Sequence, residues 1–238
     1  MSKPKVIGIL GGMGPAASAE TYTQVVRICQ RQFNAVEDDE FPEIVVYSLP
    51  LKGFDYRGFS AQQGKNVLEQ LLTALQKMET MGVEVVVIDC NTVHVFYPHL
   101  QEHTRAKIIN LVETTVDYCV QKGVRKVGVL CSNTSSRLRL YNKPLTDAGI
   151  ESLEIKPKEQ KQIDKAILAV MGGKETYVHH EQLNAVIERL FDQGADAIII
   201  GCTEISLLLK NRVDANRYID SQWLSVQKAV HHSYTNKV

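Results

Sequence analysis

The feature that most constrains the fold of this chain is a regular alternation of short apolar runs with helical patterns. Five runs of strand length are continuously apolar, at Val6–Leu10, Ile44–Ser48, Val83–Asp89, Val127–Leu130 and Ala197–Ile200. Such runs are typical of parallel strands covered on both faces. Helical patterns lie between them, at Ala17–Gln32, Asn66–Met81, Val112–Lys122, Lys161–Met171 and His180–Gln193. This order predicts an α/β fold, and glycines mark the expected helix ends at Gly82, Gly123, Gly149 and Gly194.

The two halves of the chain resemble each other. VIGILGG near the start is similar to VGVLCSN at 127–133, and VVVIDCNT at 85–92 is similar to AIIIGCTE at 197–204. We therefore predict two pseudo-symmetric domains, each with a mainly parallel sheet flanked by helices. The first is expected to comprise residues 1–108 plus 209–238, and the second residues 109–208. The tail is expected to form a helix over Trp223–Ser233, capped by Asp220 or Ser221.

Two cysteines stand at matching strand ends, Cys90 in DCNTVH and Cys202 in GCTEI. Ligands bind beyond the carboxyl ends of parallel strands, so we expect an active site in the cleft between the domains, with both thiols in it. A helix N-terminus favours the thiolate. One thiolate and one thiol could remove a proton from one face of a carbon and deliver a proton to the other. A cysteine can also be a plain buried apolar residue, our interpretation of Cys29 and Cys119.

The segment GGMGPAAS at 11–18 follows the first strand. It matches the dinucleotide-binding pattern only weakly, because Pro15 interrupts the loop and no acidic residue ends the second strand. Backbone N–H groups near Gly12 and Met13 could instead approach a small carboxylate. His94 and Glu204 could each support a thiol, or serve only their own loop or helix.

Composition excludes several classes of protein. The 27 basic and 27 acidic residues balance, so we expect neither nucleic-acid nor membrane binding. The five cysteines form no CxxC pair and no HExxH is present, so neither a disulfide framework nor a metal site is expected. The apolar run at the N-terminus is too short for a signal sequence, and we expect a cytoplasmic protein.

Three motifs in order, GGMGP at 11–15, CNTVH at 90–94 and GCTEI at 201–205, resemble the aspartate/glutamate racemase superfamily, in particular its aspartate racemase branch. The resemblance implies an enzyme that uses neither pyridoxal phosphate nor a metal, with Cys90 and Cys202 as catalysts, and it suggests a homodimer. It also implies a set of residues that hold the amino acid or lie opposite it, namely Asn91, Thr92, Thr203 and the Thr134–Ser135 loop.

Two positions depart from the family pattern. A lysine that is common in the second half is replaced here by Met171, and Lys174 is a displaced substitute. The side-chain-binding arginine corresponds to Arg57, in a loop of different sequence. We therefore expect racemisation of aspartate and/or glutamate, with broader specificity left open. The alternatives are a maleate isomerase or hydantoin racemase that uses the same thiols, or a catalytically silent small-acid-binding protein.

Overall fold

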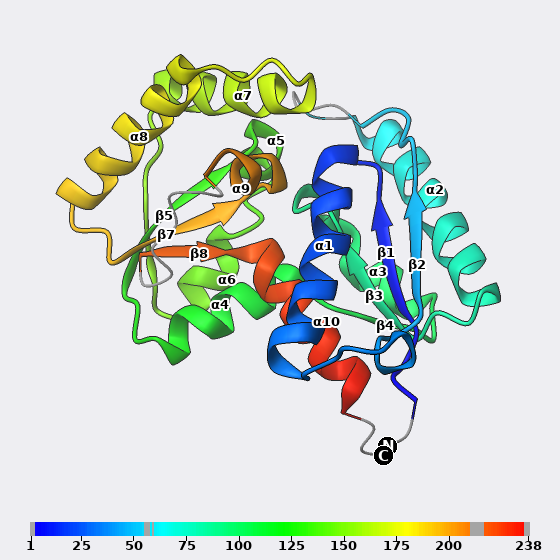
Figure 1. Cartoon of the computed structure of the whole chain (residues 1–238). Coiled ribbons are helices and arrows are strands. Elements are labelled where there is room, and N and C mark those ends of the chain that lie inside the picture. Colours follow the sequence, from blue (N-terminus) through cyan, green and yellow to red (C-terminus); the bar gives the residue numbers. More distant parts are fainter. Residues whose placement is uncertain (1–2, 55–57, 59, 210–216, 236–238) are drawn as a thin grey trace. The chain divides into compact units, whose positions relative to one another are not determined.

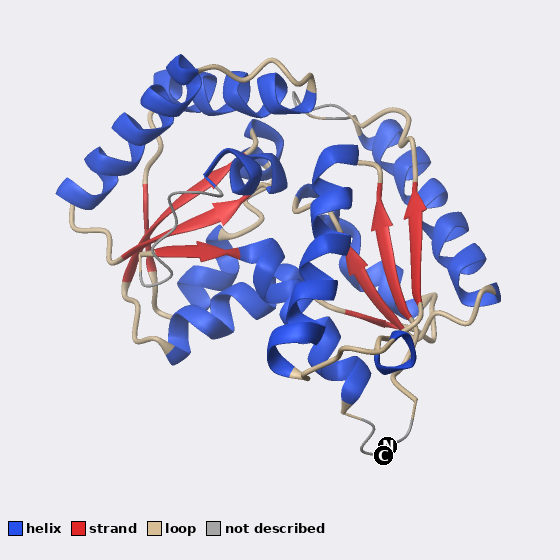
Figure 2. Cartoon of the chain, viewed as in Figure 1, coloured by secondary structure: helices blue, strands red, loops and turns tan. Residues whose placement is uncertain are grey.

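The computed structural model describes residues 3–54, 58, 60–209 and 217–235. The chain forms two compact units. Unit 1 comprises Met1–Phe54, Phe59–Asn110 and Trp223–Val238, and unit 2 comprises Asp55–Gly58 and Leu111–Gln222. Each unit contains a four-stranded parallel sheet flanked by helices (Figures 1 and 2). The predicted α/β fold is confirmed.

Unit 1 has the strand order β2-β1-β3-β4. Its strands are β1 (Ile7–Gly11), β2 (Ile44–Ser48), β3 (Val85–Ile88) and β4 (Lys107–Ile108). Its helices are α1 (Pro15–Gln32), η1 (Asp38–Glu40), α2 (Ala61–Thr80), η2 (Thr92–Phe96), α3 (Tyr97–Glu102) and most of α10 (Ser221–Tyr234). Side chains of β1 and β3 alternate between two apolar clusters, one shared with α1 and α10 and the other with α2 and α3. Burial on both faces explains the continuously apolar sequences of β1 and β3, whereas β2 at the edge of the sheet is only partly buried, contrary to expectation.

Unit 2 has the corresponding order β6-β5-β7-β8. Its strands are β5 (Lys126–Cys131), β6 (Glu151–Leu153), β7 (Ala197–Gly201) and β8 (Tyr218–Asp220). Its helices are α4 (Leu111–Gln121), α5 (Asn133–Arg137), α6 (Asn142–Asp147), α7 (Pro157–Met171), α8 (Tyr177–Asp192) and α9 (Thr203–Leu209). One apolar cluster joins β5 and β7 to α7, α8 and α9, while α4 and α6 contact β8 and β6.

The register of the sheets makes the internal repeat explicit. Leu10 pairs with Ile88 in unit 1, and Leu130 pairs with Ile200 in unit 2. Gly8 and Gly128 occupy equivalent places two residues earlier, and each lies under a helix. A Cβ atom on Gly8 would collide with the Met78 side chain, and one on Gly128 would lie 2.6 Å from Leu190 Cδ1. The repeated glycines therefore allow α2 and α8 to pack close to their strands.

Three short strands were not predicted, because β4, β6 and β8 are only two or three residues long and form no apolar run. Because β8 pairs with β7, the chain stays in unit 2 through β8 and joins unit 1 at Trp223. The sequence had suggested residue 209 for this boundary. All four glycines expected at helix ends have positive φ angles. Asp220 caps α10, its Oδ1 accepting a hydrogen bond from the Gln222 amide at 2.9 Å.

Among the described residues, no helix combines the length and apolar character needed to cross a bilayer.

Candidate active site

Cys90 follows β3 at the carboxyl edge of the first sheet, next to the end of β1 and the glycine loop. It is 8% exposed, and the residues after it, Asn91 and Thr92, are also buried. These polar residues begin η2, so the chain turns sharply where the strand ends. Cys90, Asn91, Thr92 and His94 thus lie together at the turn between β3 and η2.

His94 supports the backbone of this loop. Its ring Nδ1 lies 2.9 Å from the Cys90 carbonyl oxygen, and its amide donates to the Asn91 carbonyl at 3.0 Å. Because a carbonyl only accepts, Nδ1 carries the hydrogen. Burial lowers the pKa of His94, and backbone groups of Cys90, Ile109 and Asn91 offset this only in part. The imidazole is therefore neutral at neutral pH and fixes the turn that carries Cys90.

The glycine loop after β1 is tied to the start of α1. The Gly12 amide donates to Ser18 Oγ at 3.0 Å, and Ser18 Oγ donates to the Gly14 carbonyl at 3.2 Å. Gly12 has φ +88° and lies against the backbone of Leu49. The Gly12 amide, which the sequence predicted to face a carboxylate, thus donates to a side chain of α1. Met13 is partly buried against the cluster that contains Cys90.

Cys202 lies directly after β7 and directly before α9, and it is 9% exposed. Its Sγ donates to Glu204 Oε2 at 3.1 Å, and Thr203 Oγ1 donates to the same oxygen at 3.0 Å. Glu204 is itself buried, with 5% exposed. The carboxylate, the thiol and the hydroxyl form one cluster at the start of a helix, where unpaired amides favour negative charge.

Burial raises the pKa of Glu204, although hydrogen bonds from Cys202, its own backbone and Thr203 act in the opposite direction. A carboxyl group with a raised folded pKa binds protons more tightly in the folded state, so its ionisation costs stability. This cost is absent below the unfolded pKa and grows as pH rises through the folded pKa.

We therefore expect Glu204→Gln to remove a loss of stability that the wild type suffers as pH rises from about 4 to neutral. Urea unfolding at several pH values measures the difference between the two proteins. Glu181→Gln is the control, because Glu181 is exposed on α8 and should leave the pH dependence unchanged. Parallel pH curves for wild type and Glu204→Gln would contradict the assignment.

The remaining predicted residues are distributed over unit 2. Thr134 is buried in α5, after β5, next to a first turn that Ser132 caps by accepting from the Ser135 amide at 3.2 Å. Lys174 is exposed in the connection between α7 and α8. Arg57 lies outside the described residues. The structure thus gathers Thr134, Cys202 and the residues after Cys202 at the carboxyl ends of β5 and β7.

Sequence reasoning missed a buried carboxylate beside Cys90. Asp89 is fully buried, and its Oδ1 accepts from Thr21 Oγ1 of α1 at 3.0 Å. An acidic residue that ends the apolar run VVVID was the available signal.

The other three cysteines differ from Cys90 and Cys202 in what the structure indicates about their acidity. Burial raises the pKa of Cys119 and of Cys131 to about 12, and it also raises the pKa of Cys29. These three are poor bases at neutral pH.

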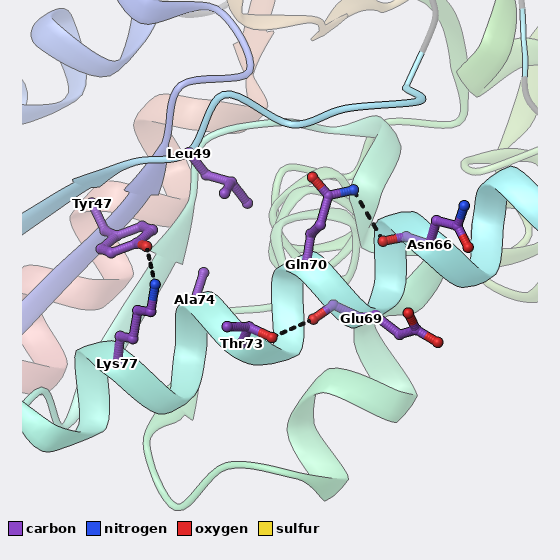
Figure 3. A pocket seen from close by; sticks show the side chains of 8 residues that line it. All are labelled: Tyr47, Leu49, Asn66, Glu69, Gln70, Thr73, Ala74 and Lys77. Atoms are coloured by element: carbon purple, nitrogen blue, oxygen red, sulfur yellow. Dashed lines mark hydrogen bonds between the residues drawn. The ribbon is translucent and has the colours of Figure 1, made fainter.

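Within the described part of the chain, no three His, Cys, Asp or Glu side chains are placed to hold a metal ion. A shallow cavity of about 410 Å³ lies between β2 and α2 in unit 1 (Figure 3). There Lys77 Nζ donates to the Tyr47 hydroxyl at 3.3 Å, and Thr73 Oγ1 donates to the Glu69 carbonyl at 2.9 Å. None of the predicted site residues that the structure describes lines this cavity.

Comparison with known proteins gives consistent matches. Residues 10–229 match the family described as Asp/Glu/hydantoin racemase. The broad specificity amino-acid racemase RacX of Bacillus subtilis is 27% identical over 219 residues, which are 91% of this chain and 92% of RacX. The aspartate racemase of Picrophilus torridus has the same fold, with a TM-score of 0.80, 21% identity and coverage of 95% of this chain and 94% of that structure.

A Pyrococcus horikoshii aspartate racemase homologue superposes with a TM-score of 0.78 at 22% identity, covering 96% of this chain and 99% of that structure.

Proposed function

Because the chain belongs to the Asp/Glu/hydantoin racemase family and is therefore an isomerase, we propose that it inverts a free α-amino acid with Cys90 and Cys202 as its two acid/base groups. One observation carries the proposal. Ile88 pairs with Leu10 and Ile200 pairs with Leu130, which are equivalent positions in the two sheets, and each cysteine stands two residues after its isoleucine. The two thiols thus occupy equivalent places on equivalent strands.

The proposed reaction moves two protons. The thiolate of one cysteine takes the α-hydrogen as a proton, so that an S–H bond forms, the C–H bond breaks and the electron pair stays on a planar carbanion. The thiol of the other cysteine then donates its proton to the opposite face, leaving a thiolate there. The enzyme ends with its proton on the other cysteine.

The surrounding residues have proposed roles in this reaction. Asn91, Thr92, Thr134 and Thr203 hold the amino acid, with hydrogen bonds to the α-carboxylate that stabilise the carbanion. Glu204 is a positioning residue, because its contacts within unit 2 are with Sγ of Cys202 and Oγ1 of Thr203. The short contact with Sγ supports a role in orienting that thiol and in holding its proton.

We propose aspartate and glutamate as substrates, by resemblance to the aspartate racemase branch. A wider range also has support, because Met171 replaces the usual lysine and the similar B. subtilis protein is named for its broad specificity. A cation near the distal carboxylate would strengthen binding of the acidic amino acids. Arg57 and Lys174 are the proposed sources of that cation.

The test is inversion of single enantiomers, without added cofactor and under a thiol reductant. Purified protein is incubated with each enantiomer of aspartate, glutamate and a set of uncharged amino acids, and with maleate and a 5-substituted hydantoin as alternatives. Chiral chromatography is expected to show at least one amino acid approaching equal amounts of both forms. The Cys90→Ser/Cys202→Ser double variant is the control for contaminating racemases. Conversion of maleate or the hydantoin alone would contradict the proposal.

A further inference from the structure

A second cavity, of about 350 Å³, lies in unit 2 at the carboxyl edge of β5 and β6. It opens where the two strands separate. Their last register pair is Gly128 with Leu153, after which β5 continues to Cys131 while the chain leaves β6 through Glu154 and Ile155. The turn from α5 to α6 contributes another wall. A cavity of this size suits a small ligand.

Two opposite charges line this cavity, Arg139 and Glu154. Both residues are exposed, and within the described residues neither side chain has an ion pair or a hydrogen bond. Arg139 has φ +53°, a left-handed conformation that is rare for a residue with a side chain. Its amide donates to the Ser136 carbonyl at 3.0 Å and its carbonyl accepts from the Asn142 amide at 3.2 Å. Such strained residues cluster at binding sites.

The other lining residues are of two kinds. Ser136, Asn142 and Ser152 offer hydroxyl and amide groups that make no side-chain hydrogen bond within the described part of the protein. The remaining wall includes apolar side chains, among them Val129 and Ile155, and also Ser135, whose hydroxyl accepts a hydrogen bond from Ser132 Oγ. A ligand that satisfies this lining has one negative group, one positive group and a short aliphatic part.

We propose that this cavity binds a free α-amino acid as a zwitterion. Its carboxylate pairs with the Arg139 guanidinium, whose planar fork matches a carboxylate, and its ammonium group pairs with the Glu154 carboxylate. Its side chain lies against Val129 and Ile155. Among the described residues, Ser135 belongs both to this lining and to the loop that the family resemblance places opposite the substrate. Cys90, Cys202 and the proposed substrate-holding residues Asn91, Thr92, Thr134 and Thr203 do not line the cavity, so this is a second site and the inference goes beyond the proposed function.

Two side chains that line the cavity also lie against β7, the strand directly before Cys202. A Cβ atom on Gly201 would lie 3.2 Å from both Cys131 Cβ and Tyr141 Cε2, and these two residues also line the cavity. One layer of side chains thus separates the bound amino acid from the residue before Cys202. Close-packed interiors transmit small displacements, so an occupant of this site is positioned to influence Cys202.

The test is a titration of the full chain that carries ¹³C-labelled isoleucine δ1-methyl groups. The Ile155 resonance is assigned by its loss in Ile155→Val. Glycine and alanine are expected to shift this resonance saturably. Acetate lacks the ammonium group and methylamine lacks the carboxylate, so each is expected to bind at least about tenfold more weakly than glycine. A peptide, whose ammonium and carboxylate groups lie far apart, should bind as weakly as acetate and methylamine.

Variants separate this site from the rest of the protein. Arg139→Ala and Glu154→Gln are each expected to weaken the Ile155 response at least about tenfold, and Arg139→Lys less. Lys143→Ala is the matched control and should leave the response unchanged, because Lys143 is exposed on α6 and pairs with Asp147 outside the cavity. The same variants are assayed for inversion of an amino acid.

Loss of the Ile155 response with inversion retained would support a second amino-acid site. No saturable shift up to about 50 mM, far beyond the range of specific binding, would overturn it. A response unchanged in both Arg139→Ala and Glu154→Gln would also overturn it, as would acetate binding as well as glycine. Equal losses of inversion and of Ile155 response would assign the cavity to the catalytic site. Absence of inversion in wild type bears only on the proposed function.

Discussion

Cys90→Ser and Cys202→Ser are each expected to lower the rate of inversion by at least about a thousandfold, because general acid/base catalysis contributes factors of this size and inversion needs both groups. A serine hydroxyl is far less acidic than a thiol. At neutral pH it therefore neither ionises to act as the base nor donates a proton readily to the carbanion. Chiral chromatography of the product measures the effect. Cys119→Ala is the control, because Cys119 is buried in α4 and burial raises its pKa to about 12.

The two serine variants are expected to differ in hydrogen exchange. By resemblance to the family, we expect Cys90 to act on the D-form and Cys202 on the L-form. In deuterated water, Cys90→Ser should exchange the α-hydrogen of the L-form, and Cys202→Ser that of the D-form, without inversion. Proton NMR of each enantiomer measures the exchange. Full inversion by either variant, or the same exchanged enantiomer in both, would contradict the division of labour between the thiols.

Gly12→Ala is expected to lower the free energy of unfolding by about 2–5 kcal/mol. Two costs add, since φ +88° strains any residue with a Cβ atom by about 1–2 kcal/mol and overpacking costs about 1–3 kcal/mol. The new Cβ would lie 2.5 Å from both the backbone nitrogen and the carbonyl oxygen of Leu49. Backbone atoms at the end of β2 have little freedom to move away. Urea unfolding followed by circular dichroism measures the loss.

Gly82→Ala separates the two costs of the Gly12 substitution. Gly82 has φ +82°, close to that of Gly12, but nothing lies within 4 Å of its added Cβ atom. The control should therefore show only the conformational cost of about 1–2 kcal/mol. Equal losses in the two variants would mean that the contact with Leu49 relaxes freely. A larger loss in Gly12→Ala would establish that the loop before α1 depends on this close approach.

Hydrophobic periodicity predicted the parts of the fold that long apolar runs encode. The central strands β1, β3, β5 and β7 and their covering helices lie within a few residues of their predicted bounds, because burial on both faces requires apolar side chains throughout. The short edge strands β4, β6 and β8 carry no such pattern. Their pairing depends on a neighbouring strand that is already in place, which periodicity does not encode.

The candidate site divides in the same way. The sequence predicted Cys90 and Cys202 as the candidate catalysts, because repeated strands are followed by the same residue type and the motifs around them resemble one family. It left open whether Glu204 and His94 act on the thiols. The tertiary structure distinguished them, with the Glu204 carboxylate on the thiol of Cys202 and the His94 ring on the carbonyl of Cys90.

The α/β class, the internal repeat and the chemistry that two thiols at strand ends can perform all follow from the sequence. The sequence already indicated that Cys29 and Cys119 are plain buried residues, and the tertiary structure added Cys131, because its burial raises the pKa of that thiol to about 12. The tertiary structure also brings Asp89 into contact with Thr21. In unit 2, it places Arg139 and Glu154 in the same cavity. Contacts of this kind join residues distant along the chain, and they follow from the way strands and helices pack.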